Sequence, residues 1–171
     1  LLALRAHERG TTAAFGWAGL AAGLAASAKY NGSIAILFPL LAGWLTAGTL
    51  MVRLQRSLII CGAAGIGFLA GTPYAVLDMP KFLNDYARLA AVFARERQGE
   101  PGWSIYLKHL RGAMGWPALL MALAGLAVSI VRTVTGPGRV RSVLLVAFAT
   151  VYFTVMAGSY QIYGRYLLPL F

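Results

Sequence analysis

A lysine between two apolar runs is the first residue in this sequence that could do chemistry. Lys29 is followed by Tyr30 and Asn31, and apolar residues lie on both sides of this group. Ionisable residues close to membrane depth are costly, and they commonly line polar cavities. An ammonium group there could bind an anionic ligand. The alternative is that the long side chain of Lys29 reaches the membrane interface from a helix hairpin turn and binds nothing.

The second candidate is an arginine near the end of the chain. Arg165 lies among tyrosines that include Tyr163 and Tyr166. Its planar guanidinium suits two parallel hydrogen bonds to a phosphate group. The alternative is a boundary arginine within a belt of interfacial aromatic residues.

Tyr74 and Asp78 form a third group, just after the apolar run that ends at Pro73. They could line the same cavity as Lys29. Alternatively, Asp78 could cap a helix that begins near Pro80, because an aspartate before a helix accepts hydrogen bonds from its free amide groups.

No strong catalytic or metal-binding motif accompanies these residues. The chain has a single cysteine, Cys61, and two histidines, His7 and His109, and it lacks a Walker loop and a His-Glu-x-x-His sequence. We therefore expect no metal ion and no cofactor.

The composition is that of a membrane protein. Of the 171 residues, 59% are hydrophobic and 12% are charged, against roughly 45–50% and about 25% in soluble domains. The formal net charge of +10 could suit nucleic acid, but the basic residues lie in short loops between apolar runs, and no aromatic and basic face for base stacking is present. We expect a lipid bilayer as the partner, and no nucleic acid.

The apolar runs are long enough to cross that bilayer as helices. Crossing takes about 20 residues, because each residue rises about 1.5 Å through a hydrocarbon core of about 30 Å. We therefore predict an all-α fold, a polytopic transmembrane helix bundle, with residues 1–171 as part of one transmembrane domain. A sixth span begins at Tyr166, after five runs that come close to the required length: 11–28, 33–52, 58–72, 116–131 and 143–158.

Small residues recur in the first run. Gly16, Gly19 and Gly23 are spaced by three and four residues. In lipid, a small face on a helix allows two backbones to approach closely. We interpret these glycines as a packing face and not as a ligand site.

The loop charges predict the orientation, because short cytoplasmic loops collect lysine and arginine. The rule predicts that three segments with arginines are cytoplasmic. They contain Arg5 and Arg9, Arg53 and Arg56, and Arg132, Arg139 and Arg141. The segments 29–32, 73–115 and 159–165 then lie on the opposite face. The long segment 73–115 is itself basic, which runs against the charge rule.

Two amphipathic stretches are predicted within this long segment. Residues 80–97 carry an apolar stripe at helical spacing, and a second, shorter stretch runs from Trp103 to Arg111. Aromatic residues favour the headgroup region. We expect both stretches to be interfacial helices on the extracytoplasmic side. The stripe consists of Phe82, Leu83, Tyr86, Leu89, Ala90 and Phe93.

Three phrases of the sequence resemble a known family. They are residues 23–32 (GLAASAKYNG), residues 72–78 (TPYAVLD, with Phe82 after it) and residues 163–169 (YGRYLLP). Their order and spacing are similar to those of the bacterial family 39 glycosyltransferases. That family includes the dolichyl-phosphate-mannose protein mannosyltransferases and the lipid A aminoarabinose transferases.

The resemblance implies a membrane-embedded C-type glycosyltransferase of the bacterial inner membrane. Such an enzyme moves a sugar, with inversion, from a polyprenyl-phosphate carrier to an acceptor on the non-cytoplasmic face. Arg165 falls in the family's Arg-Tyr motif and would face the carrier phosphate, with Lys29 as a weaker second contact. The family's catalytic acid lies in the first extracytoplasmic loop, and nothing in this sequence matches it. Since the chain begins at Leu1 and ends at Phe171 within an apolar run, we expect an inactive part of a longer enzyme.

Two other classes of protein remain open. A transporter would place polar groups on broken helices at mid-membrane, as the break at Lys29 loosely suggests, but it often has repeated halves, and none is visible. A non-catalytic scaffold would need only the packing features and could use the amphipathic segment for docking. An acidic pair in a preceding loop would favour the enzyme, whereas an inverted second set of spans would favour the transporter.

Overall fold

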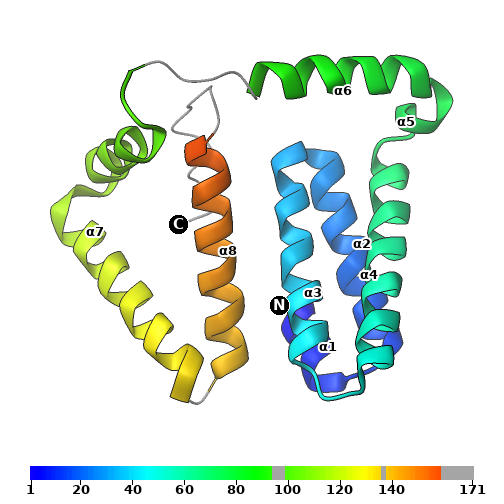
Figure 1. Ribbon diagram of the computed structural model, residues 1–171, viewed down its shortest axis with the longest axis horizontal. Coiled ribbons are helices and arrows are strands. Elements are labelled where there is room, and N and C mark those ends of the chain that lie inside the picture. The colour runs from blue at the N-terminus through cyan, green and yellow to red at the C-terminus, as the bar shows by residue number, and fades with distance from the viewer. Residues whose placement is uncertain (94–98, 136–137, 159–171) are drawn as a thin grey trace. The chain divides into compact units, whose positions relative to one another are not determined.

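The computed structural model describes residues 1–93, 99–135 and 138–158, and every regular element among them is a helix (Figure 1). The prediction of an all-helical fold is thus confirmed for this part of the chain. Three helices are apolar and long enough to cross a membrane: Leu50–Gly71, Gly102–Val134 and Arg139–Gly158. The chain divides into two compact units, unit 1 (Leu1–Met79) and unit 2 (Pro80–Phe171).

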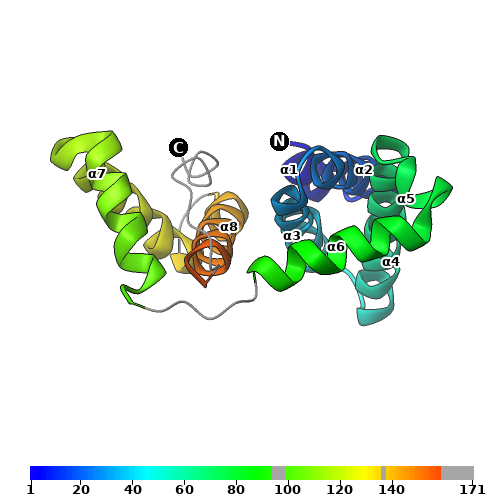
Figure 2. The ribbon, with the colours of Figure 1, turned by 90° about the horizontal axis from the view of Figure 1, so that it is seen from above.

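Unit 1 is a bundle of three long elements with a short amphipathic helix beside it. Viewed along the helices, α1 lies against α2 and α3 (Figure 2). Its elements are α1 (Leu2–Arg9), α2 (Thr12–Ala28), the 3₁₀ helix η1 (Tyr30–Ile36), α3 (Leu37–Leu45), α4 (Leu50–Gly71) and α5 (Tyr74–Leu77).

Helices α2 and α4 touch backbone to backbone, and glycine makes this possible. A Cβ at Gly19 would lie 2.5 Å from the carbonyl oxygen of Ile60, and a Cβ at Gly23 would collide with the carbonyl of Ala64. On α4, Gly67 meets the carbonyl of Leu20 in the same way. The predicted packing role is confirmed for Gly19 and Gly23. Residue numbers rise together along the contact, so the two helices run parallel.

The predicted second span, 33–52, is not a single helix. Residues 30–36 form η1, and α3 ends at Leu45. Pro39 has no amide proton for the carbonyl four residues earlier, and its ring crowds that carbonyl, which favours a different helical geometry in the preceding turn. The chain then reverses through Thr46 and Gly48, at which φ is 155°. This turn consists of small residues, which hydropathy does not distinguish from a helix.

The predicted third span, 58–72, begins earlier than expected. Thr49 caps α4, because its hydroxyl oxygen accepts a hydrogen bond from the amide of Val52 at 3.4 Å. Arg53 and Arg56 therefore lie in the first two turns of α4, and the expected loop around them is wrong.

Unit 2 contains a helical hairpin. Tyr106 of α7 is fully buried. Its ring centroid lies 6.4 Å from the ring centroid of Phe153 on α8, and the angle between the two ring planes is 58°. Leu119 and Leu144 are also buried. Large side chains thus make up much of the buried core in the described part of this unit. The helices are α6 (Met79–Phe93), α7 (Gly102–Thr135) and α8 (Arg139–Gly158).

Helix α7 is kinked, and the kink separates its two predicted parts. Gly115 has φ 70° and ψ 169°, a conformation that favours glycine. Pro117 then occupies the first turn of the second part, where its missing amide proton costs no hydrogen bond. The amphipathic stretch from Trp103 to Arg111 and the apolar run 116–131 are therefore both helical, as predicted.

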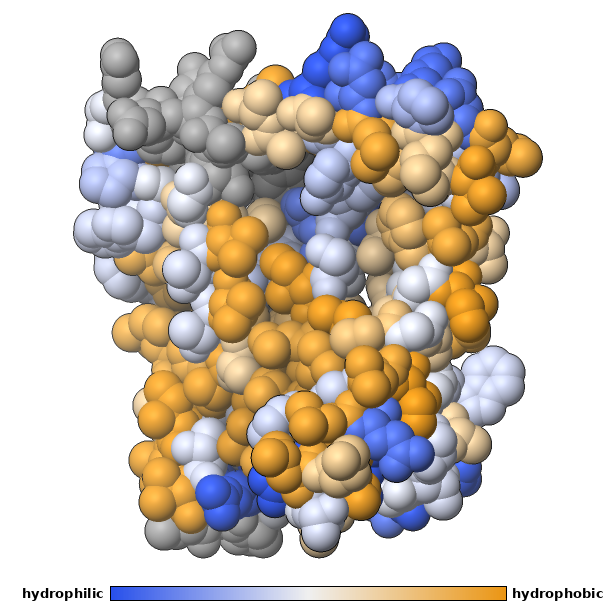
Figure 3. Space-filling view, turned by 45° about the vertical axis from the view of Figure 1, so that its right-hand side comes forward, coloured by the Kyte–Doolittle hydropathy of each residue, from blue (hydrophilic) through white to orange (hydrophobic). Residues whose placement is uncertain are grey.

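Large apolar side chains remain exposed along unit 1. Leu58 and Ile66 of α4 are 74% and 63% exposed. In the space-filling view, hydrophobic residues cover much of the middle of the face drawn, and hydrophilic residues gather nearer its upper and lower ends (Figure 3). An apolar surface of this extent is typical of a protein that faces lipid.

Candidate functional site

The turn at Lys29 is held by its backbone. The Lys29 amide donates to the carbonyl of Ala25 at 3.2 Å, and the Lys29 carbonyl accepts from the amide of Gly32 at 2.7 Å. A side chain at Gly32 would collide with the Ala25 carbonyl, so η1 returns close against α2. The Lys29 side chain is exposed at the point where α2 ends and η1 begins.

The second group lies on a short helix that follows α4. Pro73 precedes α5, which begins with the exposed Tyr74. Asp78 ends α5, where its amide donates to the carbonyl of Tyr74 at 3.0 Å, and α6 begins at the next residue. The position of Asp78 directly before α6 fits the predicted cap, and the alternative, that Asp78 lines a cavity, stays a prediction.

Parallel packing brings these two groups to one end of unit 1. Gly71, at the end of α4, lies against Ser27, two residues before Lys29. The start of η1 and α5 accordingly both lie at the upper end of unit 1 in Figure 1. We call this end, with Lys29, Tyr74 and Asp78, the lysine end.

The remaining predicted site residues lie outside the described part of the chain. Arg165, Tyr163 and Tyr166 belong to the range 159–171, whose placement the structure does not describe. Their predicted role therefore stays a prediction. Within the described ranges, no group of three histidine, cysteine, aspartate or glutamate residues could hold a metal ion.

The opposite end of unit 1 carries most of its arginines, and Arg56 has a structural role there. Its Nη1 donates to the carbonyl oxygens of Thr46 at 3.2 Å and Ala47 at 3.1 Å. Its guanidinium also lies over the ring of Phe15, with Cζ 5.3 Å from the ring centroid. A cation at the C-terminal end of a helix is favourable, because the last carbonyls there lack partners and the helix dipole is negative.

A histidine joins α1 to this end. The ring Nδ1 of His7 lies 2.8 Å from the hydroxyl oxygen of Thr46, and the Thr46 hydroxyl donates its single hydrogen to the carbonyl of Ala42 at 2.7 Å. Since that hydrogen is already used, Nδ1 of His7 must be the donor. We call this end the arginine end. Sequence reasoning missed these contacts, because no spacing pattern links His7, Thr46 and Arg56.

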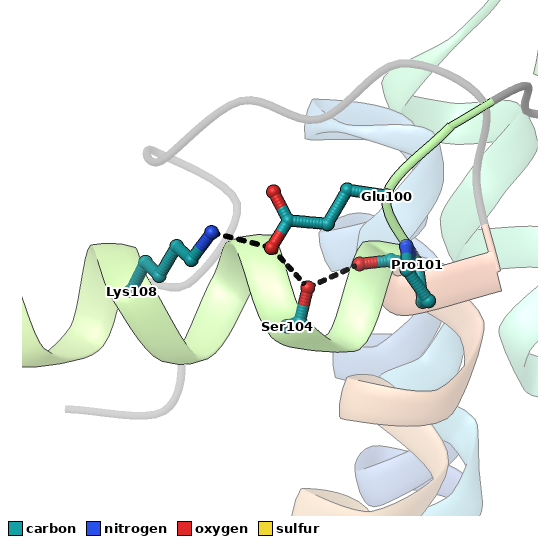
Figure 4. Close-up of polar contacts among 4 residues, drawn as sticks. All are labelled: Glu100, Pro101, Ser104 and Lys108. Atoms are coloured by element: carbon teal, nitrogen blue, oxygen red, sulfur yellow. Dashed lines mark hydrogen bonds and ion pairs between the residues drawn. The ribbon is translucent and has the colours of Figure 1, made fainter.

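A charged cluster begins α7 in unit 2 (Figure 4). The carboxylate of Glu100 pairs with the ammonium of Lys108 and accepts a hydrogen bond from the Ser104 hydroxyl at 2.7 Å. The bond from Lys108, and then that from Ser104, hold the pKa of Glu100 below its usual value. This carboxylate stays ionised and engaged near neutral pH, which suits a helix start and not a general base.

A cation and an aromatic ring lie on either side of the kink in α7. The guanidinium carbon of Arg111 is 4.7 Å from the ring centroid of Trp116, and Gly115 lies between them in the chain. Such pairs are worth about 0.5–1 kcal/mol at exposed sites. The contact fits a helix boundary in an interfacial region, where tryptophan and arginine are favoured.

Comparisons of the chain with protein-family models, with curated proteins and with solved structures gave no match. The similarity to family 39 glycosyltransferases thus stays a prediction from the three sequence phrases.

Proposed function

We propose that this chain is part of an integral membrane glycosyltransferase that moves a sugar from a polyprenyl-phosphate carrier to an acceptor on the non-cytoplasmic face. The observation that carries the proposal is that two segments, residues 29–32 and 72–78, lie at the same end of unit 1, next to the close approach of Gly71 to Ser27. Both segments belong to the phrases that resemble family 39. They lie 40 residues or more apart in the sequence, so their position at one end is a result of the fold.

The lengths of the elements support five membrane crossings. Helix α2 has 17 residues, or about 25 Å at the α-helical rise. Together η1, with 7 residues, and α3, with 9 residues, extend over about 27 Å, because a 3₁₀ helix rises about 2.0 Å per residue. Both lengths approach the hydrocarbon thickness of about 30 Å. With α4, α8 and the second part of α7, this makes five spans.

The positions of the arginines support the orientation. Arg53 and Arg56 lie at the arginine end of unit 1, and Arg132, Arg139 and Arg141 lie around the turn between α7 and α8. If these positions are cytoplasmic, α4 crosses the membrane from the cytoplasmic to the non-cytoplasmic side, and the second part of α7 crosses it in the opposite direction. Helix α6 and the first part of α7, which connect these two spans in the sequence, are then interfacial helices on the non-cytoplasmic side.

The proposed chemistry explains why cations are needed there. When the glycosidic bond breaks, the carrier phosphate gains negative charge, and a fixed cation stabilises that charge in the transition state. We assign the main phosphate contact to Arg165 and a weaker one to Lys29. Tyr74, Asp78, Tyr163 and Tyr166 would line the cavity around the carrier head group.

The test uses the full-length protein that contains this chain, purified in detergent with a radiolabelled polyprenyl-phosphate sugar. We expect Arg165→Ala to lower turnover by about a hundredfold and Lys29→Ala by about tenfold, in line with the loss of a charge-stabilising group. Arg141→Ala removes an exposed arginine from α8 and should leave turnover unchanged. Yield and thermal stability must match the wild type for each variant.

Each other outcome has a clear meaning. Unchanged turnover in Arg165→Ala would show that Arg165 does not bind the carrier phosphate and would favour its alternative role as a boundary arginine in an aromatic belt. Absence of turnover in the wild type with several donors would reject the enzyme. Counterflow of a labelled solute into proteoliposomes would then identify a transporter, and its absence would favour a scaffold.

A further inference from the structure

Two arginines on α1 point away from the bundle that holds this helix. Arg5 and Arg9 are exposed, one helical turn apart, whereas Ala3 and Ala6 are buried on the other side. Like charges at this spacing repel and weaken a helix. Neither arginine forms an ion pair within the described part of the chain.

The packing explains why α1 forms in spite of this repulsion. A helix of 8 residues is too short to be stable alone. The buried alanines and the hydrogen bond between His7 and Thr46 attach it to α2 and α3. The helix therefore presents Arg5 and Arg9 at a fixed spacing beside the arginine end.

Tryptophans place this end at a membrane interface. Trp44, 42% exposed, donates its indole N–H to the Ser57 hydroxyl at 3.1 Å, and that hydroxyl donates to the carbonyl of Arg53 at 3.0 Å. Trp17, near the start of α2, is exposed as well. Tryptophan is enriched where a membrane meets water, with its ring among the lipid head groups.

We propose that Arg5 and Arg9 bind the phosphate group of an anionic phospholipid in the leaflet at the arginine end. Two guanidinium groups one turn apart can share one phosphate, which also removes their mutual repulsion. Leu2, 44% exposed, lies on the same short helix and suits an acyl chain. This apolar neighbour favours a lipid over free phosphate. The proposal rests on the membrane placement of unit 1 and not on sugar transfer.

The test measures lipid selectivity of the full-length protein by native mass spectrometry. Protein in detergent is titrated with equal amounts of phosphatidylglycerol and phosphatidylcholine, and the ratio of bound lipids is compared. Each basic residue near an anionic surface contributes about fivefold in binding, so Arg5→Gln with Arg9→Gln should lower the ratio by about tenfold or more. The double variant Arg5→Lys with Arg9→Lys keeps both positive charges and should retain most of the preference for phosphatidylglycerol.

Two controls can overturn the proposal. Lys81→Gln with Arg88→Gln removes two exposed charges from α6, and an equal fall in the ratio would show a general charge effect without a site. Inorganic phosphate at about a 50-fold molar excess over lipid should not displace phosphatidylglycerol. Displacement would show a soluble-anion site. An unchanged ratio in the glutamine variant would reject the site altogether.

Discussion

The two units solve the problem of packing helices in different ways. In unit 1, α2 and α4 bring their backbones together, with Gly19 and Gly23 against carbonyl groups of the facing helix. In unit 2, α7 and α8 are held apart by side chains, with Tyr106 buried against Phe153. The glycine contacts leave no room for even one carbon atom, whereas the aromatic contact depends on bulk.

The glycines of this chain have more than one structural role. Gly23 and Gly67 are required by close contact, and Gly115 is required by a positive φ. By contrast, Gly62 and Gly125 lie in helices where an added carbon would meet nothing within 4 Å. All five stand in apolar sequence, so only the structure separates them.

The largest expected effect comes from filling the contact between α2 and α4. Gly23→Leu should destabilise the protein by about 4 kcal/mol or more, because the atoms it would strike belong to the backbone and cannot rotate away. Gly62→Leu adds the same side chain on an open face and should cost less than about 1 kcal/mol. Reversible unfolding in mixed micelles would measure both free energies. Similar values for the two variants would contradict the glycine contact.

The converse test removes bulk from unit 2. Tyr106→Ala should cost about 3 kcal/mol, since it empties a fully buried site against Phe153. Leu107→Ala removes the next residue, which is partly exposed, and should cost about 1 kcal/mol or less. The same unfolding assay applies. A larger loss for Leu107→Ala would mean that α7 and α8 pack through another face.

A smaller effect is expected at the end of α3. Arg56→Gln should destabilise unit 1 by about 1–2 kcal/mol, through loss of the charge at the helix terminus and of the contact with Phe15. Gln55→Ala, at an exposed neighbouring position, is the matched control. Hydrogen exchange of the Thr46 and Ala47 region should accelerate in Arg56→Gln only. No acceleration would show that Arg56 does not hold this turn.

The smallest effect concerns Glu100, which is exposed. Because pairing lowers its pKa in the folded protein, the stabilisation is present above the ordinary pKa of glutamate and is lost as pH falls through the lowered value. The start of α7 should therefore loosen at a pH below the ordinary pKa of glutamate, seen as a change in Trp103 fluorescence. Glu100→Gln should remove this acid transition. A transition that persists there belongs to another group.

Much of the fold follows from the sequence, because long apolar runs in lipid have few alternatives to helices. The glycine spacing at Gly19 and Gly23 also predicted the close contact. The turn after Leu45 could not be predicted in the same way. It consists of small residues that continue the apolar run, and only the cap at Thr49 marks the new helix.

The candidate site was less accessible to sequence reasoning. Hydropathy marked Lys29 as a break and Pro73 as a helix end, but it could not show that both lie at one end of unit 1. That depends on whether α2 and α4 run parallel, which follows from the number of elements between them. The contacts of His7 and Arg56 depend on side-chain reach between helices, for which a single sequence has no signal.

The contacts of Arg56 bear on the order in which the chain enters the membrane. Until the first two turns of α4 exist, the carbonyls of Thr46 and Ala47, directly after α3, lack the donor that Arg56 supplies. Only the four residues 46–49 join the two helices, so Arg56 can close this turn as soon as the first two turns of α4 have formed. Helices α3 and α4 are thus best released from the translocation machinery together, as a preformed hairpin.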